Sequence, residues 1–597
     1  MSNGSDNGTR ALARGVSPLT RALAMAGDGL SGTLMLGFTG ALAALGHDGL
    51  AFLSGIAGGW LIALTLIAPH LQRAGHLGPV MFVARRFGSV TAVAAGGVLV
   101  LATLVLLAAE LTALAMPLRL LLGVDGPTGV AIAAALTLVV ALAARSGAVT
   151  GLQALLFVPL AAALMLPVFL PALASAGVPV PQLAYGAVLQ SISDLELKRL
   201  GEELADPVSL KAYLRPFTTM TPSATVMLTL SMALGLAAMP RLLMRPVQAG
   251  SAHQARWVLA VGFVLLLLAL LALPPLAAAV RHGLLETLVG REPGRLDPWL
   301  FDLGRAGLAR VCGVAAVSAD AVSAACAALP EAPERLRLDD IDLARDALLL
   351  ALPALGGLPS LVTHLLAAAV AVAALAAAAW LAVALRDDVA GIGVRPPPLA
   401  EHPAGETSDT PPLWRRMLAL VLVLAAIAGA AAFAATDPAD LATLVAWGLA
   451  VAAAGLTPAL VAGIWWQRAT AAGTFAGIVC GVALTVYYIV ATRYFAIGFY
   501  ETWSGLSNAG FGAVADFEAA RDALAAATGE DQAAALAELD AAARRAANWF
   551  GIRSIGAGVL GAGAGTLVLL LVSAVTPRPG PSARLLVERM RMPSHGG

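Results

Sequence analysis

The stretch Ala26-Gly27-Asp28-Gly29-Leu30-Ser31-Gly32 places a carboxylate between glycines in the middle of a long apolar segment. A charge is costly inside a bilayer, so an ionisable residue there is a functional-site hypothesis by default. Glycine tolerates backbone that leaves the helix, and such backbone occurs at membrane depth only where it lines a cavity or is buried in protein. The stretch predicts a broken helix with Asp28 at the break, which is typical of transporters. The alternative is a polar residue hydrogen-bonded to a neighbouring helix.

The rest of the chain is also built for lipid, since 59% of its 597 residues are hydrophobic and 12% are charged. A soluble protein is about a quarter charged. We expect an all-α polytopic membrane protein with about twelve spans of roughly 20 residues each. They are 22–45, 49–70, 89–116, 127–144, 148–171, 223–240, 257–280, 361–385, 417–435, 440–465, 470–491 and 551–576. The segment 347–360 is too short and broken to span, so we expect it to be re-entrant or interfacial.

Charge and cysteine usage exclude several classes of protein. The net charge is zero, which argues against nucleic-acid binding. The three cysteines lack metal-ligand spacing. Cys312 and Cys326 fall in one loop, where a disulfide is possible, and Cys480 lies in a span. Because no nucleophile–base pair, phosphate loop or metal cluster appears, we expect no enzyme and no cofactor other than a possible sodium ion.

Arginine placement predicts the orientation in the membrane. With the N-terminus in the cytoplasm, most arginines fall on the inner side, Arg241 and Arg245 among them, and the short outer loops hold only Arg119. Long loops cross largely regardless of charge. Both termini are therefore expected inside, and the bias toward Ala, Gly and Arg suits the inner membrane of a GC-rich bacterium. The long outer loops are 172–222, 282–346 and 492–550.

The segments outside the membrane have characters of their own. Residues 514–547 have the charge pattern of an amphipathic helical hairpin. Residues 303–328 carry arginines and an aspartate, so we place them outside as well. The proline-rich segment 387–414 is expected to be a flexible cytoplasmic linker.

Four motifs carry a resemblance to a known family. They are Arg14-Gly15-Val16-Ser17-Pro18 with 27–32, Gly46-His47-Asp48-Gly49 with Gly58-Gly59-Trp60, Gly235-Leu236-Ala237-Ala238-Met239-Pro240-Arg241, and Gly463-Ile464-Trp465-Trp466-Gln467-Arg468 with Gly473 and Gly477. In their order and spacing, over residues 14–480, they resemble the sodium:solute symporters, and among these the cation–acetate (short monocarboxylate) branch. Met239 stands where that branch has Leu, and Arg241 where it has His.

The resemblance implies a LeuT-like core of five plus five helices in inverted repeats, with core helices one and six broken around a central site. Some members of the branch work with a small two-span partner subunit, which becomes a possible partner here. The expected segments are a cytoplasmic N-terminal segment 1–21, a first repeat 22–171, an outer loop 172–222, a second repeat 223–465 with outer loop 282–346 and cytoplasmic linker 386–416, additional helices 466–576 with the outer insertion 492–550, and a cytoplasmic tail 577–597.

The same resemblance suggests the substrate cavity and a small organic anion as substrate. The cavity residues would be Gly27, Asp28, Gly29, Ser31, Gly32 and Thr33. An anion needs a positive partner, and we identify no Lys or Arg well inside a span. Helix N-termini and glycine N–H groups near this stretch are therefore predicted to fill that role.

The expected cation site departs from the family pattern. Where the family has a Ser-Thr pair in its eighth core helix, the chain has Ala376-Ala377, and Trp380 replaces a Gly. Alanine side chains cannot coordinate a cation, whereas hard cations want oxygen ligands. The remaining candidates for cation coupling are the carbonyls near Ala26, Gly29 and Leu30, together with Ala376, Ala377, Glu110 and Gln153.

Glu110 suggests a different coupling ion. A carboxylate buried in an apolar span has a raised proton affinity and can carry a proton. Glu110, with Asp28, could thus move coupling from sodium to protons. The alternatives are that Glu110 hydrogen-bonds between helices or lies near the solvated outer surface. Gln153 is expected near the family's sodium site or in a helix–helix hydrogen bond.

Two functions follow. One is a secondary active symporter of a small monocarboxylate such as acetate, coupled to sodium or protons and working by alternating access. The other is a non-transporting family member that acts as a sensor or scaffold subunit, which the lost hydroxyls and enlarged outer loops favour. The retained Asp28 and glycine break favour the carrier.

Overall fold

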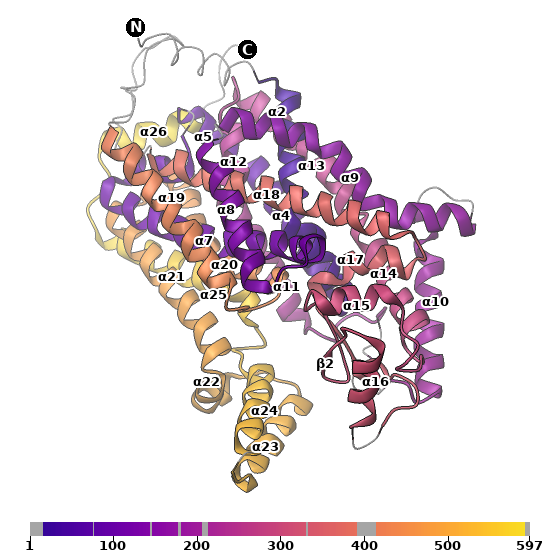
Figure 1. Ribbon diagram of the computed structural model, residues 1–597. Coiled ribbons are helices and arrows are strands. Elements are labelled where there is room, and N and C mark those ends of the chain that lie inside the picture. The colour runs from indigo at the N-terminus through magenta and orange to yellow at the C-terminus, as the bar shows by residue number, and fades with distance from the viewer. Residues whose placement is uncertain are drawn as a thin grey trace.

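The computed structural model describes residues 16–75, 77–143, 146–176, 181–205, 210, 213–329, 332–390, 413–529 and 531–591. These residues form a bundle of long helices with smaller elements projecting from one end (Figure 1). Within them, ten helical segments are long and apolar enough to cross a membrane, or up to eleven with one bent pair. That count takes Thr33–Arg73 as one segment, although the turn at 46–49 divides it where the sequence predicts the spans 22–45 and 49–70.

The first group of helices runs from residue 18 to residue 176. Its members are α2 (Pro18–Gly29), η1 (Thr33–Phe38), α3 (Thr39–Leu45), η2 (Gly46–Gly49), α4 (Leu50–Ile62), η3 (Ala63–Ile67), α5 (Ala68–Arg73), α6 (Pro79–Phe87), α7 (Ser89–Leu122), α8 (Gly126–Ala143) and α9 (Ser146–Ala176). The predicted break is present, because α2 ends at Gly29 and Leu30 leaves helical geometry at φ −78° and ψ 52°.

The second group contains the counterpart of this break. Its members are α11 (Pro222–Ala238), α12 (Pro240–Val247), α13 (Ala252–Leu270), α14 (Leu273–Gly283), η4 (Leu284–Leu288), α17 (Leu348–Leu355), α18 (Ser360–Ala390), α19 (Leu413–Ala434) and α20 (Leu441–Trp465). Helices α11 and α12 meet at 43°. A residue before proline avoids the helical region, so Met239 is extended and Pro240 starts a new helix.

Two predicted spans differ in detail, and the segment expected not to span forms a short helix. Proline cannot donate a backbone hydrogen bond, so the span 257–280 is interrupted at 271–272, just before Pro274 and Pro275. The segment 348–355 is a separate eight-residue helix, as its breakers predicted. Helix α18 continues past 385 to Ala390, and its last turns include buried Asp388, which accepts hydrogen bonds from the N–H groups of Val80 and Met81. The remainder of the predicted linker, 391–412, lies outside the described residues.

Further elements cover the remaining chain. They are α10 (Pro181–Gly201), α15 (Pro298–Arg305), β1 (Ala309–Val311), β2 (Val314–Ala315), α16 (Ala319–Ala327), η5 (Leu338–Asp340), β3 (Ile341–Leu343), η6 (Arg345–Ala347), α21 (Ala471–Tyr494), α22 (Ala496–Trp503), η7 (Ser504–Leu506), α23 (Phe511–Ala526), α24 (Asp531–Ala546), η8 (Ser554–Gly556), α25 (Ala557–Val575) and α26 (Pro581–Arg591). The hairpin predicted at 514–547 is present as α23 and α24, which lie side by side away from the bundle (Figure 1).

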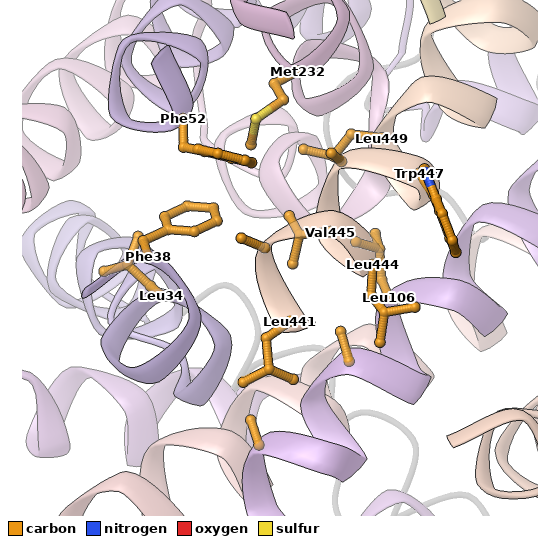
Figure 2. Close-up of a cluster of buried hydrophobic side chains, with 14 of the residues drawn as sticks. Leu34, Phe38, Phe52, Leu106, Met232, Leu441, Leu444, Val445, Trp447 and Leu449 are labelled. Carbon is orange, nitrogen blue, oxygen red and sulfur yellow. The ribbon is translucent and has the colours of Figure 1, made fainter. Parts of the chain in front are cut away.

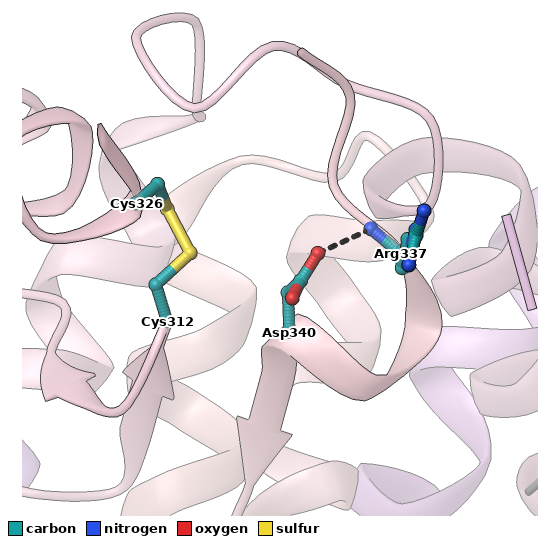
Figure 3. The surroundings of a disulfide bond; sticks show 4 residues. All are labelled: Cys312, Cys326, Arg337 and Asp340. Carbon is teal, nitrogen blue, oxygen red and sulfur yellow. Dashed lines mark hydrogen bonds between the residues drawn. A yellow bond between two sulfur atoms is a disulfide. The ribbon is translucent and has the colours of Figure 1, made fainter. Parts of the chain in front are cut away.

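The loop 282–346 contains a small sheet that the sequence analysis does not predict. Its strand order is β2-β1-β3, and both pairings are antiparallel. The possible disulfide between Cys312 and Cys326 is present beside this sheet (Figure 3). In Figure 1 these elements lie at the same end of the bundle as α23 and α24, whereas α26 and the start of α2 lie at the opposite end.

Candidate functional site

The site is built where the two helix breaks meet. Asp28 lies in the last turn of α2, and Arg241 lies in the first turn of α12. The Nε of Arg241 donates to Oδ2 of Asp28 at 2.8 Å, and its Nη2 donates to the backbone carbonyl of Asp28 at 2.7 Å. On the other side, Nη1 lies 3.7 Å from Oε1 of Glu110, which comes from the middle of α7. One guanidinium therefore stands between two buried carboxylates.

A second arginine lies one helical turn further along α12. Arg245 is 1% exposed and donates to the Ala24 carbonyl at 3.1 Å and to Oγ1 of Thr150 at 3.3 Å. It also donates to Oε1 of Gln153. Its guanidinium lies 3.8 Å from the centroid of the Trp380 ring, a geometry in which the π-face attracts the cation. The Trp that replaces a family Gly thus supports a buried positive charge.

Gln153 and Trp380 link this pair of arginines to neighbouring helices. Nε2 of Gln153 donates to Oδ1 of Asp28 at 3.0 Å and to the Ala376 carbonyl at 3.1 Å. Nε1 of Trp380 donates to the Arg241 carbonyl at 3.0 Å. Gln153 therefore makes hydrogen bonds between helices, and one of its partners is Ala376, another residue of the expected cation site.

Arg241 and Arg245 follow the predicted span 223–240, yet the structure places both beside the helix breaks. Arg241 and Arg245, counted above among the arginines of the inner side, lie in the protein core. Residues four apart share one helix face, and a buried charge is normally paired. A buried Asp28 therefore predicts a positive side chain close to it in the fold. Arg241 and Arg245, which share one face of α12, were the candidates for that side chain.

Glu110 is enclosed by hydroxyl groups as well as by Arg241. Its Oε1 accepts a hydrogen bond from Oγ1 of Thr33 at 2.7 Å, and its Oε2 accepts from the Thr33 N–H at 3.3 Å. Ser31 Oγ lies 2.9 Å from Thr33 Oγ1. Glu110 is 1% exposed, which rules out the alternative of a solvated carboxylate at the outer surface. The interhelical hydrogen bond is present.

A cavity of about 60 Å³ adjoins this cluster. Four of the six expected cavity residues line it, namely Asp28, Gly29, Ser31 and Thr33, and Arg241 lines it as well. The opposite walls are apolar, and Figure 2 shows five of their side chains: Leu34, Phe38, Leu106, Val445 and Leu449. The cavity thus has a polar end at the helix break and an apolar body.

The other two expected cavity residues, Gly27 and Gly32, lie at helix contacts instead. A Cβ at Gly27 would lie 2.3 Å from the Gln153 carbonyl oxygen, and one at Gly32 would lie 2.4 Å from Cβ of Ala374. These glycines let α9 and α18 approach the broken helix closely.

The expected cation site offers few free oxygens. Ala376 and Ala377 are buried and lack hydroxyls, and the Ala376 carbonyl accepts from Gln153. The Ala26 carbonyl accepts from the Leu30 N–H at 3.0 Å. The nearby carbonyls of Ala24 and Asp28 accept from arginines. A cation at these carbonyls would compete with fixed N–H donors, so the carbonyls of Gly29 and Leu30 are the candidate ligands that remain from the expected set.

Two broken helices around a buried charge cluster and a cavity are typical of membrane transporters. The model of the sodium:solute symporter family matches residues 12–290. A relative from Cupriavidus necator, described as an uncharacterized symporter, is 24% identical, over 97% of this chain and 89% of the relative.

The fold is similar to that of a solved Na⁺-coupled sialic acid symporter in a substrate-bound outward-open state. The TM-score is 0.57 at 12% identity, over 94% of this chain and 91% of the other. The match over residues 12–290 agrees with the predicted resemblance to the sodium:solute symporter family, and the chain has the LeuT-like fold. The predicted all-α fold class is confirmed, and the ten long apolar helices of the described residues indicate a multi-pass membrane protein.

Proposed function

We propose that the protein is a secondary active symporter of a small monocarboxylate such as acetate, with a proton as the coupled cation. The observation that carries the proposal is the position of Arg241, which lies between Asp28 and Glu110 at the wall of the cavity. Transport would follow alternating access around this point, where both broken helices end.

The size and lining of the cavity support a small anion. A volume of about 60 Å³ has room for roughly four water molecules, which suits a substrate of a few heavy atoms. Arg241 can donate to a carboxylate, and guanidinium–carboxylate bonds are among the strong hydrogen bonds. Ser31 and Thr33 offer hydroxyl donors beside it, while Phe38 and Ile56 face an alkyl group.

Charge balance supports coupling to a proton. With both carboxylates ionised, Asp28 and Glu110 balance Arg241 and Arg245, so the buried cluster is neutral. An entering anion adds one negative charge, and an uncompensated buried charge is costly. A proton on Glu110 restores neutrality and releases one side of Arg241 for the substrate carboxylate. Proton and anion would then cross together without net charge.

Uptake of radiolabelled acetate into proteoliposomes tests this proposal. We expect an inward proton gradient to drive accumulation and a sodium gradient to have no effect. Glu110→Gln should reduce proton-driven accumulation at least tenfold, because the group that carries the proton is removed. The variant should still exchange acetate across the membrane when no gradient is imposed. Glu501→Gln, which neutralises an exposed carboxylate in α22, should behave as wild type.

Other results would contradict specific parts of the proposal. Proton-driven accumulation that survives Glu110→Gln would refute the role of Glu110. Sodium-driven accumulation would refute proton coupling. A folded protein that transports acetate under neither gradient, with any two-span partner subunit present, would favour another substrate or the scaffold alternative, which the ion-paired cluster and the enlarged outer elements support.

We also propose that the protein lies in a bacterial inner membrane with both termini in the cytoplasm. Disulfides persist in oxidising compartments, so the bond between Cys312 and Cys326 supports an outward position of loop 282–346. The arginine bias described above supports the same orientation.

A further inference from the structure

A second cavity, which we call the outer arginine cavity, lies among the outer elements and has a volume of about 270 Å³. Its walls come from α3, α4, η6, the start of α20, the end of α21, α24 and η8. Its charged lining residues are Arg345, Asp346, Asp440, Arg493, Arg544 and Arg553. Four positive side chains thus face two negative ones.

The two carboxylates hydrogen-bond to the N-terminus of α20, and Asp346 also feels the charge of Arg345. Oδ2 of Asp346 accepts from the Leu441 N–H at 2.9 Å. Asp440 caps the same helix by accepting from the N–H and the hydroxyl of Thr443, each at 3.0 Å. Burial and the neighbouring Asp440 raise the pKa of Asp346 to about 7. The negative charge available to the cavity at neutral pH is therefore reduced further.

Two of the arginines lack a directly bonded carboxylate. Arg544 pairs with Asp540, and Arg493 donates to the Pro438 carbonyl at 2.7 Å. Arg345 and Arg553 make no ion pair with any residue in the described part of the chain. Both side chains line the cavity and are exposed to solvent, and their like charges repel each other, although Asp48 acts on Arg553 with the opposite charge. An anion between them would relieve this repulsion.

The outer arginine cavity lies next to the central cavity. Phe38 lines the central cavity and Phe52 lines the outer one. Their ring centroids are 5.6 Å apart, and both side chains are buried. On α20, Val445 faces the central cavity and Trp447 the outer one (Figure 2). The phenylalanine pair therefore separates the two cavities.

We propose that the outer arginine cavity is a vestibular binding site for a small carboxylate anion, held by Arg345 and Arg553 before it passes the Phe38–Phe52 pair. The identity of the anion rests on the proposed function, whereas the binding site itself does not. The inference also gives the outer insertion 492–550 a task, because α24 contributes Arg544 to the wall of the cavity.

Cysteine labelling tests the local potential without reference to transport. Ser554 lines the cavity, and Cys480, which the structure shows as the unpaired cysteine, is replaced by Ala. In purified full-length protein, Ser554→Cys is labelled with negatively and positively charged methanethiosulfonates. We define the labelling ratio as the rate with the negative reagent divided by the rate with the positive reagent. If the cavity is positive, this ratio at Ser554→Cys should be about tenfold or more above the ratio at exposed Ser504→Cys. High salt should reduce the difference.

The charge variants and acetate then test the site itself. When Arg345→Gln and Arg553→Gln are added to Ser554→Cys, its labelling ratio should fall to that of Ser504→Cys. The substitution Arg521→Gln on exposed α23 should leave the ratio at Ser554→Cys unchanged. At constant ionic strength set with chloride, acetate should slow labelling at Ser554→Cys and leave Ser504→Cys unaffected. In proteoliposomes the double variant should raise the KM for acetate several-fold and leave kcat unchanged.

Each outcome decides between the two proposals. Equal ratios at the two cysteines, or a ratio insensitive to the double variant, would overturn the vestibular site. Labelling that acetate does not slow would overturn carboxylate binding there. A high ratio with acetate protection, in a protein that fails to transport acetate, would support the site and refute the proposed function.

Discussion

Arg241 is the residue on which the candidate site depends. Its guanidinium contacts one carboxylate directly and lies 3.7 Å from another. Two buried carboxylates without this cation would repel each other in a region of low dielectric. An ion pair of this kind adds little net stability, but removal of one partner is strongly destabilising because the other charge stays buried.

We therefore predict that Arg241→Gln lowers the free energy of unfolding by about 3–5 kcal/mol and abolishes uptake. Adding Asp28→Asn should recover most of the thermal stability, because the uncompensated charge is removed, but should not recover uptake. Thermal unfolding in detergent, followed by fluorescence-detected size exclusion, measures the first effect. Arg521→Gln serves as the control. A double variant no more stable than Arg241→Gln would contradict the account.

Asp346 makes the stability of the outer face depend on pH. Its pKa is about 7 in the folded protein, above the value of about 3.9 in an unfolded chain. The folded state then binds more protons than the unfolded state between these values. The contribution of Asp346 to the free energy of unfolding therefore falls as pH rises from about 4 to about 7.

Asp346→Asn should accordingly reduce the loss of melting temperature between pH 5 and pH 8 by a few degrees. Asn keeps an oxygen that can accept from the Leu441 N–H, so the bond to α20 is retained. The exposed Asp342→Asn on β3 should leave the pH dependence unchanged. An unchanged slope in Asp346→Asn would mean that other groups titrate over this range.

At the scale of elements, small residues determine which helices approach closely. Helices α21 and α25 pack along their length. A Cβ at Gly561 would lie 2.4 Å from the Gly481 carbonyl oxygen, whereas one at Gly563 would meet nothing within 4 Å. The two glycines are two residues apart on α25, yet one faces a helix and the other open space. Small residues at such contacts are typical of membrane helices.

Gly561→Ala should therefore destabilise the protein by about 1–3 kcal/mol, as overpacking does. Gly563→Ala should be neutral or stabilise by up to about 1 kcal/mol, because alanine favours the helix. Thermal melting of the two variants in the same detergent makes the comparison. Equal effects would show that the α21–α25 contact is less close than the structure indicates.

For the whole molecule, the arrangement of elements predicts which face meets which compartment. The sheet with its disulfide and the α23–α24 hairpin share one end of the bundle, and α26 lies at the other (Figure 1). In a Cys480→Ala background, a membrane-impermeant thiol reagent should label Ser504→Cys in intact cells. Ser582→Cys in α26 should react only after the cells are broken. The reverse pattern would invert the proposed orientation.

The sequence by itself determined the class of the protein and the first helix break. Long apolar segments can only be membrane helices, and glycines around Asp28 permit the chain to leave the helix there. The interruption before Pro274 was not predicted, since 257–280 was expected to be one span, although proline lacks an N–H. The short strands of the outer loop were missed, since three-residue strands leave almost no periodic signal.

The tertiary structure decided how the site is composed. Asp28, Glu110, Gln153 and Arg241 are separated by long stretches of chain, and no local pattern brings them together. Sequence placed Arg241 on the inner side because a membrane arginine is usually a loop residue. Only the packing of α2, α7, α9 and α12 shows that its charge is compensated in the core. Compensation of buried charge is a property of three-dimensional neighbours, and therefore only the fold reveals it.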